Sequence, residues 1–126
     1  MLNFLLIAIG GSIGATLRYS FYLLFKNILF SNYLFFNTLL INIIGSFFIG
    51  YIIMIIGNKN FSHDFIKFFF IIGILGSFTT FSTFSIESID LMIERKYFLA
   101  FSYMFLSLSL CLLFTFLGLN LNKLVN

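Results

Sequence analysis

The sequence predicts an all-α membrane protein, with a single domain over residues 1–126 and four transmembrane helices. The first observation is composition: 61% of the residues are hydrophobic, 9% are charged, and the mean hydropathy is +1.12. Soluble domains carry about 25% charged residues, so this chain lacks the polar surface that water requires. The second observation is spacing, because short polar segments separate four apolar stretches that each reach the ~20 residues needed to cross a bilayer.

The predicted spans cover about residues 3–25, 34–56, 65–93 and 98–120. The first span lacks the positively charged start of a signal peptide, and its apolar stretch continues past Arg18 to Phe25, so we interpret it as a retained membrane helix. The third span is longer than one crossing requires, which indicates that it is not one straight helix. Antiparallel neighbouring helices are expected because the polar connections are short: residues 26–32, 57–64 and 94–96.

Four spans place both chain termini on the same side of the membrane. The Lys and Arg residues at the span ends divide equally, with Lys59, Lys67 and Lys123 on the terminal side and Lys26, Arg95 and Lys96 on the other. The positive-inside rule needs an excess on one side to select an orientation. The balance therefore fits insertion in both orientations, which would permit an antiparallel homodimer, and it equally fits chance in a short chain.

Composition also excludes several classes of function. The net charge of +3 is spread along the chain without a Lys/Arg cluster, so nucleic-acid binding is not expected. The single cysteine, Cys111, excludes an intrachain disulfide and a Cys-based metal motif, and its apolar surroundings favour a buried side chain. His63 lies in a polar connection without a second His or a Glu at ligand spacing, so a side-chain metal site is not expected. No nucleotide motif or catalytic constellation suggests an enzyme.

Polar side chains inside the spans are the functional candidates, because a charged residue at the bilayer centre costs about 2.5–3.5 kcal/mol. Arg18 follows Gly10 and Gly14, which share a helix face and permit another backbone to approach closely. Arg18 either snorkels to the helix end, pairs across an interface, or draws anions to an entrance. Asn42, at the centre of the second span beside Gly45, either bonds another helix or lines a wet path.

The third and fourth spans carry further polar groups. Glu87 and Asp90, toward the end of the third span, are either solvated at the membrane boundary or paired with Arg95 or Lys96. In the fourth span, polar side chains spaced at four residues form one stripe on one helix face, namely Tyr103, Ser107 and Cys111. Because hydroxyls in membrane helices often bond their own backbone carbonyls, this stripe is either a polar path or a set of self-bonded side chains.

The most polar stretch of the chain, GILGSFTTFSTFSIE at residues 73–87, lies inside the third span. Its glycines and clustered Ser and Thr lower helix propensity, so we predict a break, although a continuous helix packed through its hydroxyls would carry the same residues. Unwound backbone at membrane depth occurs where it is buried in protein or faces a water-filled cavity, and its carbonyls are suitable ligands for a cation. Phe81 and Phe84, one turn apart, present ring edges with partial positive charge that would suit a small anion.

Three motifs together resemble the CrcB/Fluc family of fluoride channels: GGSIGATLRY at residues 10–19, NTLLINIIGSFFIG at residues 37–50, and GILGSFTTFSTFSIE at residues 73–87. The resemblance covers the whole chain. It implies a multi-pass protein of the cell membrane, assembled from two copies as a dual-topology antiparallel homodimer with two fluoride pores. It also implies a structural sodium ion at the dimer centre and no organic cofactor.

The resemblance assigns roles residue by residue. It implies that the ion path is lined by Asn42, Phe81 and Phe84, and that a polar track lies beside it, formed by Ser82, Thr83, Tyr103 and Ser107. The sodium ion would be held by the backbone carbonyls of Gly76 and Thr79 from both subunits. Arg18 and Glu87 match the first-helix arginine and the third-helix acid of the family, with vestibule or structural roles. The chain departs from the family pattern at three positions: Asn37, Ser77 and Cys111.

The function expected from this resemblance is passive, fluoride-selective conduction that lowers cytoplasmic fluoride and its toxicity. An alternative is a four-helix proton-coupled multidrug or cation exporter, but such a transporter needs a membrane-embedded carboxylate, typically in its first helix. The first span here has Arg18 as its only charged residue and carries no carboxylate. A further alternative is a subunit that does not transport, in which the Gly, Ser and Thr residues only pack helices.

Overall fold

The structure is a computed structural model, and it describes residues 1–25, 35–57, 63–121 and 123. Within these residues the regular elements are helices, and four helical segments are long and apolar enough to cross a membrane: Leu2–Phe25, Phe35–Gly57, Ile66–Ile93 and Tyr97–Leu119. The predicted all-helical fold with four membrane-crossing segments is therefore confirmed. The connection at residues 26–32, most of that at 57–64, and the side chains of Lys26 and Lys59 lie outside the described residues.

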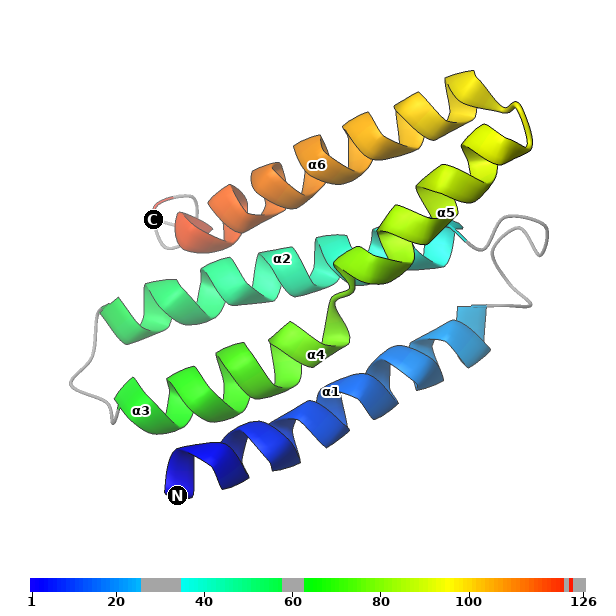
Figure 1. Cartoon of the computed structure of the whole chain (residues 1–126). Helices are drawn as coiled ribbons and strands as arrows, with labels where there is room; N and C mark the ends of the chain where they lie inside the picture. The colour runs from blue at the N-terminus through cyan, green and yellow to red at the C-terminus, as the bar shows by residue number, and fades with distance from the viewer. Residues whose placement is uncertain (26–34, 58–62, 122, 124–126) are drawn as a thin grey trace.

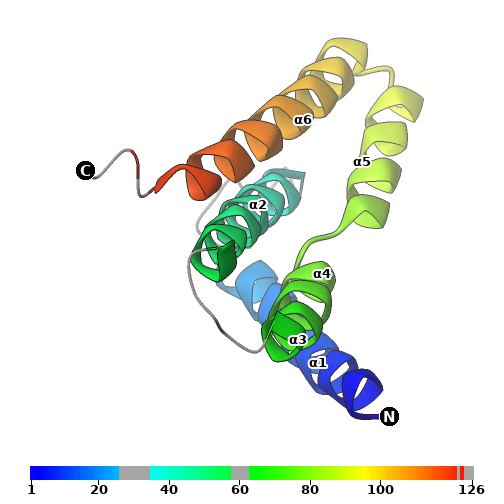
Figure 2. The same ribbon diagram turned by 90° about the vertical axis from the view of Figure 1, so that its left-hand side faces the viewer.

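The four segments form two neighbouring pairs (Figures 1 and 2). Helix α1 (Leu2–Phe25) packs against the first half of the third segment, and α2 (Phe35–Gly57) packs against α6 (Tyr97–Leu119). The third segment comprises α3 (His63–Phe65), the π-helix η1 (Ile66–Leu75), α4 (Gly76–Phe78) and α5 (Phe81–Ile93). Its last part, α5, leaves α1 and runs toward the beginning of α6, so the third segment connects the two pairs (Figure 1).

Glycines permit close contact between α1 and η1. A Cβ atom at Gly10 would overlap the carbonyl oxygen of Phe69, and one at Gly14 would overlap the carbonyl oxygen of Ile74. A Cβ at Gly73 would in turn lie 2.9 Å from the Cα of Gly10. This confirms the prediction that the glycines of the first span admit another backbone, which is how small residues stabilise helix contacts in membranes.

Glycines also permit close contact between the C-terminal halves of α2 and α6. A Cβ atom at Gly50 would overlap the carbonyl oxygen of Thr115, and one at Gly118 would overlap the carbonyl oxygen of Phe47. Because both helices lack side-chain volume at this point, their backbones approach each other directly.

The buried core lies between α2, α5 and the start of α6. Its members are Phe35, Leu39, Leu91, Ala100 and Tyr103. Many other large apolar side chains are exposed, including Phe98 at 88% and Phe105 at 70%. A soluble protein would bury such residues, whereas lipid solvates them, so this distribution suits a membrane-embedded bundle.

A tight turn reverses the chain between α5 and α6. Arg95 adopts a left-handed conformation with φ of 59°, and the Lys96 amide donates to the Leu91 carbonyl at 2.9 Å. The Lys96 ammonium lies 2.7 Å from a Glu94 carboxylate oxygen, and both side chains are about half exposed. This turn brings Tyr103 on α6 within reach of the α5 side chains.

Candidate functional site

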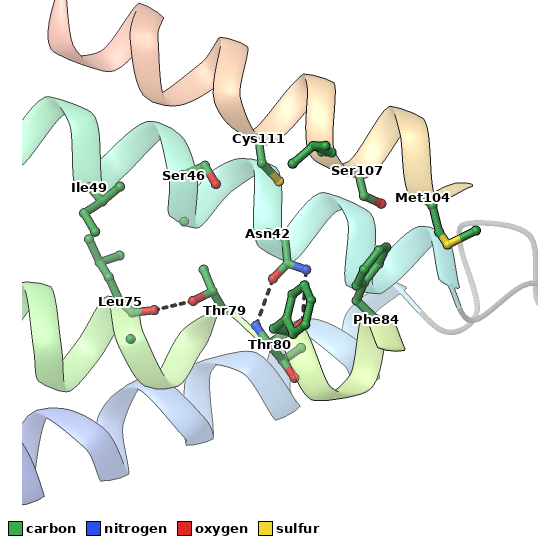
Figure 3. Close-up of a pocket in the computed structure, with 14 residues that line it drawn as sticks. Asn42, Ser46, Ile49, Leu75, Thr79, Thr80, Phe84, Met104, Ser107 and Cys111 are labelled. Atoms are coloured by element: carbon green, nitrogen blue, oxygen red, sulfur yellow. Dashed lines mark hydrogen bonds between the residues drawn. The ribbon is translucent and has the colours of Figure 1, made fainter. Parts of the chain in front are cut away.

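Two residues with extended backbone separate α4 from α5 and lie at the centre of the candidate site (Figure 3). Helix α4 ends at Phe78, and α5 begins at Phe81. Between them Thr79 has φ −74° and ψ 157°, and Thr80 has φ −148° and ψ 110°. The Thr79 amide still donates to the Leu75 carbonyl at 3.0 Å. The helical pattern stops after this bond, so the backbone groups of Thr80 need other partners.

Asn42 on α2 supplies those partners for Thr80. The Asn42 Oδ1 accepts from the Thr80 amide N–H at 2.8 Å, and the Asn42 Nδ2 donates to the Thr80 carbonyl at 3.2 Å. One side-chain amide thus satisfies both the backbone N–H and the backbone C=O of Thr80. Asn42 therefore ties α2 to the extended segment between α4 and α5, while its role in a wet path stays a prediction. Room for this contact comes from Gly45, where a Cβ would overlap the Thr79 methyl group.

Thr80 also begins α5 through its side chain. Its Oγ1 accepts from the Thr83 amide N–H at 3.2 Å, donates to the Thr83 Oγ1 at 2.9 Å, and lies 3.3 Å from the Ser82 Oγ. Thr80 is 5% exposed. Thr80 is not among the site residues predicted from the sequence, although Thr is a favoured N-cap residue and a helix that resumes at Phe81 would point to it.

These hydrogen bonds change the environment of two backbone carbonyls. In an unbroken α-helix, the Gly76 carbonyl would accept from the Thr80 N–H, and the Thr79 carbonyl would accept from the Thr83 N–H. Both amides are instead donated elsewhere, the first to Asn42 Oδ1 and the second to Thr80 Oγ1. The diversion removes the usual helical donors from the Gly76 and Thr79 carbonyls, which are the two that the family resemblance assigns to sodium.

A cavity of about 590 Å³ opens beside the extended segment, between α2, α5 and α6. It brings together six of the predicted site residues: Asn42, Gly76, Thr79, Phe81, Phe84 and Ser107. Most of the remaining lining is apolar, apart from Ser46, Thr80 and Cys111 (Figure 3). The other predicted site residues are not part of this lining: Arg18, Ser82, Thr83, Glu87 and Tyr103.

The two phenylalanine rings of the cavity pack against each other at a tilt, and Phe84 also packs against the core. The ring centroids of Phe81 and Phe84 are 5.4 Å apart with an interplanar angle of 43°, and Phe84 lies 5.2 Å from the Tyr103 ring. Phe81 is 78% exposed. Phe84 is therefore held by the fold of the single chain, whereas the Phe81 ring is largely uncovered.

Ser107 in the polar stripe on α6 differs from the self-bonded hydroxyls of the chain. Ser85, Ser88 and Thr115 each donate to the backbone carbonyl four residues before them, as self-bonded hydroxyls do. Ser107 is 6% exposed, and its Oγ has no hydrogen-bond partner within the part of the chain that the structure describes. A buried hydroxyl without a partner is costly, so the Ser107 hydroxyl is available to a ligand in the cavity that it lines.

Glu87 lies in a cluster of hydroxyl groups contributed by three other helices. The Thr38 Oγ1 donates to its Oε1 at 2.8 Å, the Tyr22 Oη donates to the same oxygen at 3.2 Å, and the Tyr103 Oη donates to Oε2 at 2.8 Å. No Lys or Arg of the described ranges forms an ion pair with Glu87. Glu87 is thus neither simply solvated nor paired with Arg95 or Lys96, and it links α5 to α1, α2 and α6 through hydroxyls.

Another candidate, Arg18, remains without a defined partner. Arg18 is half-buried on α1 and makes no hydrogen bond or ion pair with the residues that the structure describes. No group of three His, Cys, Asp or Glu side chains among the described residues is placed to hold a metal ion. A cation at this site would therefore draw on backbone, amide or hydroxyl oxygens.

Comparisons with known proteins agree with the motifs. Residues 5–119 match the family described as CrcB-like protein, Camphor Resistance (CrcB). The chain is 37% identical over 122 residues to a Campylobacter hominis protein named fluoride-specific ion channel FluC, covering 97% of this chain and 96% of that protein. Proteins with the same name from Shewanella sp. (strain W3-18-1) and Shewanella oneidensis are 41% and 42% identical over 118 residues, which is 94% of this chain, and the first alignment also covers 94% of its relative. The chain therefore belongs to the CrcB family.

Proposed function

We propose that this protein is a fluoride-selective channel of the cell membrane that lets cytoplasmic fluoride leave passively. The observation that carries the proposal is the cavity at the extended segment, where Asn42, Phe81, Phe84 and Ser107 meet. Support also comes from the relatives, which are named as fluoride-specific ion channels and align with nearly the whole chain. None of these names supports the alternative of a proton-coupled exporter.

The chemistry of the cavity suits a small, strongly hydrated anion. Fluoride gives up its water only where several short-range donors replace it, and the Ser107 hydroxyl is buried without a partner among the described residues. The edges of the Phe81 and Phe84 rings add partial positive charge without a fixed cation that would bind the anion too tightly to release it. Ser82, Thr83 and Tyr103 extend the proposed polar track beyond the cavity.

The working unit in this proposal is an antiparallel homodimer with dual topology. Phe81 is 78% exposed beside the cavity, so a second copy of the chain would cover a ring that one copy leaves open. The balanced Lys and Arg count supports insertion in both orientations. Each pore would then be completed by the partner subunit.

A structural sodium ion between the two copies is part of the same proposal. The residues fit it, because the Gly76 and Thr79 carbonyls have lost their helical donors and both lie at the cavity. Backbone carbonyls are suitable ligands for an alkali cation. When bound, the ion would supply positive charge that holds the two extended segments together.

Fluoride efflux from proteoliposomes tests the function. Vesicles loaded with potassium fluoride, diluted into fluoride-free medium and given a potassium ionophore, should release fluoride to an electrode only when they contain the protein. Vesicles loaded with potassium chloride are the control for selectivity and should release little chloride. Folded protein without fluoride release would refute the channel, and equal release of chloride would refute its selectivity.

A further inference from the structure

Cys111 is the one cysteine of the chain, and its free thiol lines the cavity of the candidate site (Figure 3). The side chain is partly exposed rather than enclosed in the core. It follows Ser107 by four residues on α6, so both side chains lie on one helix face.

Ser107 gives independent evidence that the wall beside the thiol faces a ligand. Its Oγ is buried, lines the same cavity, and lacks a hydrogen-bond partner among the described residues. Buried hydroxyls in proteins are almost always bonded, so an unbonded one indicates that the space next to it is normally occupied. Cys111 therefore borders a part of the cavity that admits small solutes.

Thiol chemistry defines which solute could react there. Sulfur is a soft ligand and selects soft metal ions over the hard ions that oxygen prefers. A charged reagent enters an apolar cavity at membrane depth only at a high cost. Mercury(II) chloride meets both conditions, because the dissolved molecule is neutral and its metal is soft.

We propose that Cys111 is a binding site for soft, thiophilic metal ions and that its occupation blocks the ion pathway. In the reaction with mercury(II) chloride the S–H bond and one Hg–Cl bond break, an S–Hg bond forms, and the proton and chloride pass to the solvent without any change of oxidation state. The bound HgCl group lies beside the Ser107 hydroxyl and covers it with a weakly hydrated surface. The block rests on the proposed channel function, whereas the binding does not.

The test compares the natural chain with two variants in the efflux assay. Mercury(II) chloride should lower fluoride efflux of the natural chain by at least about tenfold, since a narrow pathway conducts only while its lining stays accessible, and dithiothreitol should restore it. Cys111→Ser should conduct fluoride and resist mercury. The matched control is the double variant Cys111→Ser with Ser109→Cys, because Ser109 is exposed on α6 away from the stripe.

This control should bind mercury without losing efflux. Mass spectrometry of the folded protein measures binding separately, as one mercury adduct that dithiothreitol removes. A chain whose Cys111 stays unlabelled, or whose efflux persists after complete labelling, would overturn the proposal, as would equal inhibition of the control. Folded protein that forms the mercury adduct but shows no fluoride efflux even before mercury is added would refute the channel function and leave the metal site standing.

Discussion

Replacing Asn42 with alanine tests whether this side chain holds the extended segment in place. The change removes both hydrogen bonds between the Asn42 side chain and the Thr80 backbone. Because Thr80 is only 5% exposed, its backbone N–H and C=O would then lack these partners. Each buried, unsatisfied group costs about 1–3 kcal/mol, so the segment should lose about 2–6 kcal/mol of stabilisation. Since whole proteins are stable by only about 5–15 kcal/mol, the folded segment should open far more often.

Two measurements follow this change. Hydrogen exchange should show the Thr80 amide exchanging at least about tenfold faster than in the natural chain, because 1.4 kcal/mol corresponds to a factor of ten. Fluoride efflux should fall by a similar factor or more, while size-exclusion chromatography should still show the same assembly. The hydrogen bond to Asn42 should protect the Thr80 amide in the natural chain, so its exchange must be followed over hours.

Asn37→Ala is the matched control, because Asn37 is a second buried amide of α2. It is 2% exposed, and its Oδ1 has no hydrogen-bond partner among the described residues. Its removal leaves the Asn42 bonds in place, so exchange at Thr80 should stay close to that of the natural chain. Natural efflux with slow Thr80 exchange in Asn42→Ala would contradict this role of Asn42, and so would equally accelerated exchange in Asn37→Ala.

Three further changes test the phenylalanines, the helix contact and the carboxylate. Phe81→Ile should lose most fluoride efflux because it removes the ring edge, while cross-linking should still detect the proposed dimer; retained efflux would move the anion path elsewhere. Gly14→Ala should lower the thermal unfolding midpoint because its Cβ overlaps the Ile74 carbonyl, whereas Gly57→Ala, with no atom within 4 Å of the added Cβ, should not; equal midpoints would contradict the packing. Glu87→Gln replaces charge-assisted hydrogen bonds of about 1.5–3 kcal/mol each with weaker ones. The thermal unfolding midpoint of the protein in detergent should therefore fall, and an unchanged midpoint would contradict the stabilising role of this cluster.

The fold and part of the site were predictable because they depend on local sequence. Apolar stretches of sufficient length predict membrane helices wherever they occur, and the glycines at Gly10 and Gly14 predict close contact whatever the partner. The cluster of Ser, Thr and Gly around residue 79 also marks a region of low helix propensity. Because every Ser and Thr of this cluster lowers helix propensity, the sequence could not show which of them forms the N-cap. Thr80 is distinguished from its neighbours only by its contact with Asn42 on another helix.

The partners of Glu87 were beyond prediction for a different reason. Its hydroxyl donors lie 65, 49 and 16 residues away along the chain, on three different helices. Nothing in the local pattern distinguishes a tyrosine that faces lipid from one that faces a carboxylate, because the rotation of each helix about its axis is set by packing. Charge counting pointed instead to Arg95 and Lys96, which lie close in sequence but belong to the turn between α5 and α6. A carboxylate inside an apolar bundle requires donors, and four helices packed together supply them as hydroxyls rather than as a cation.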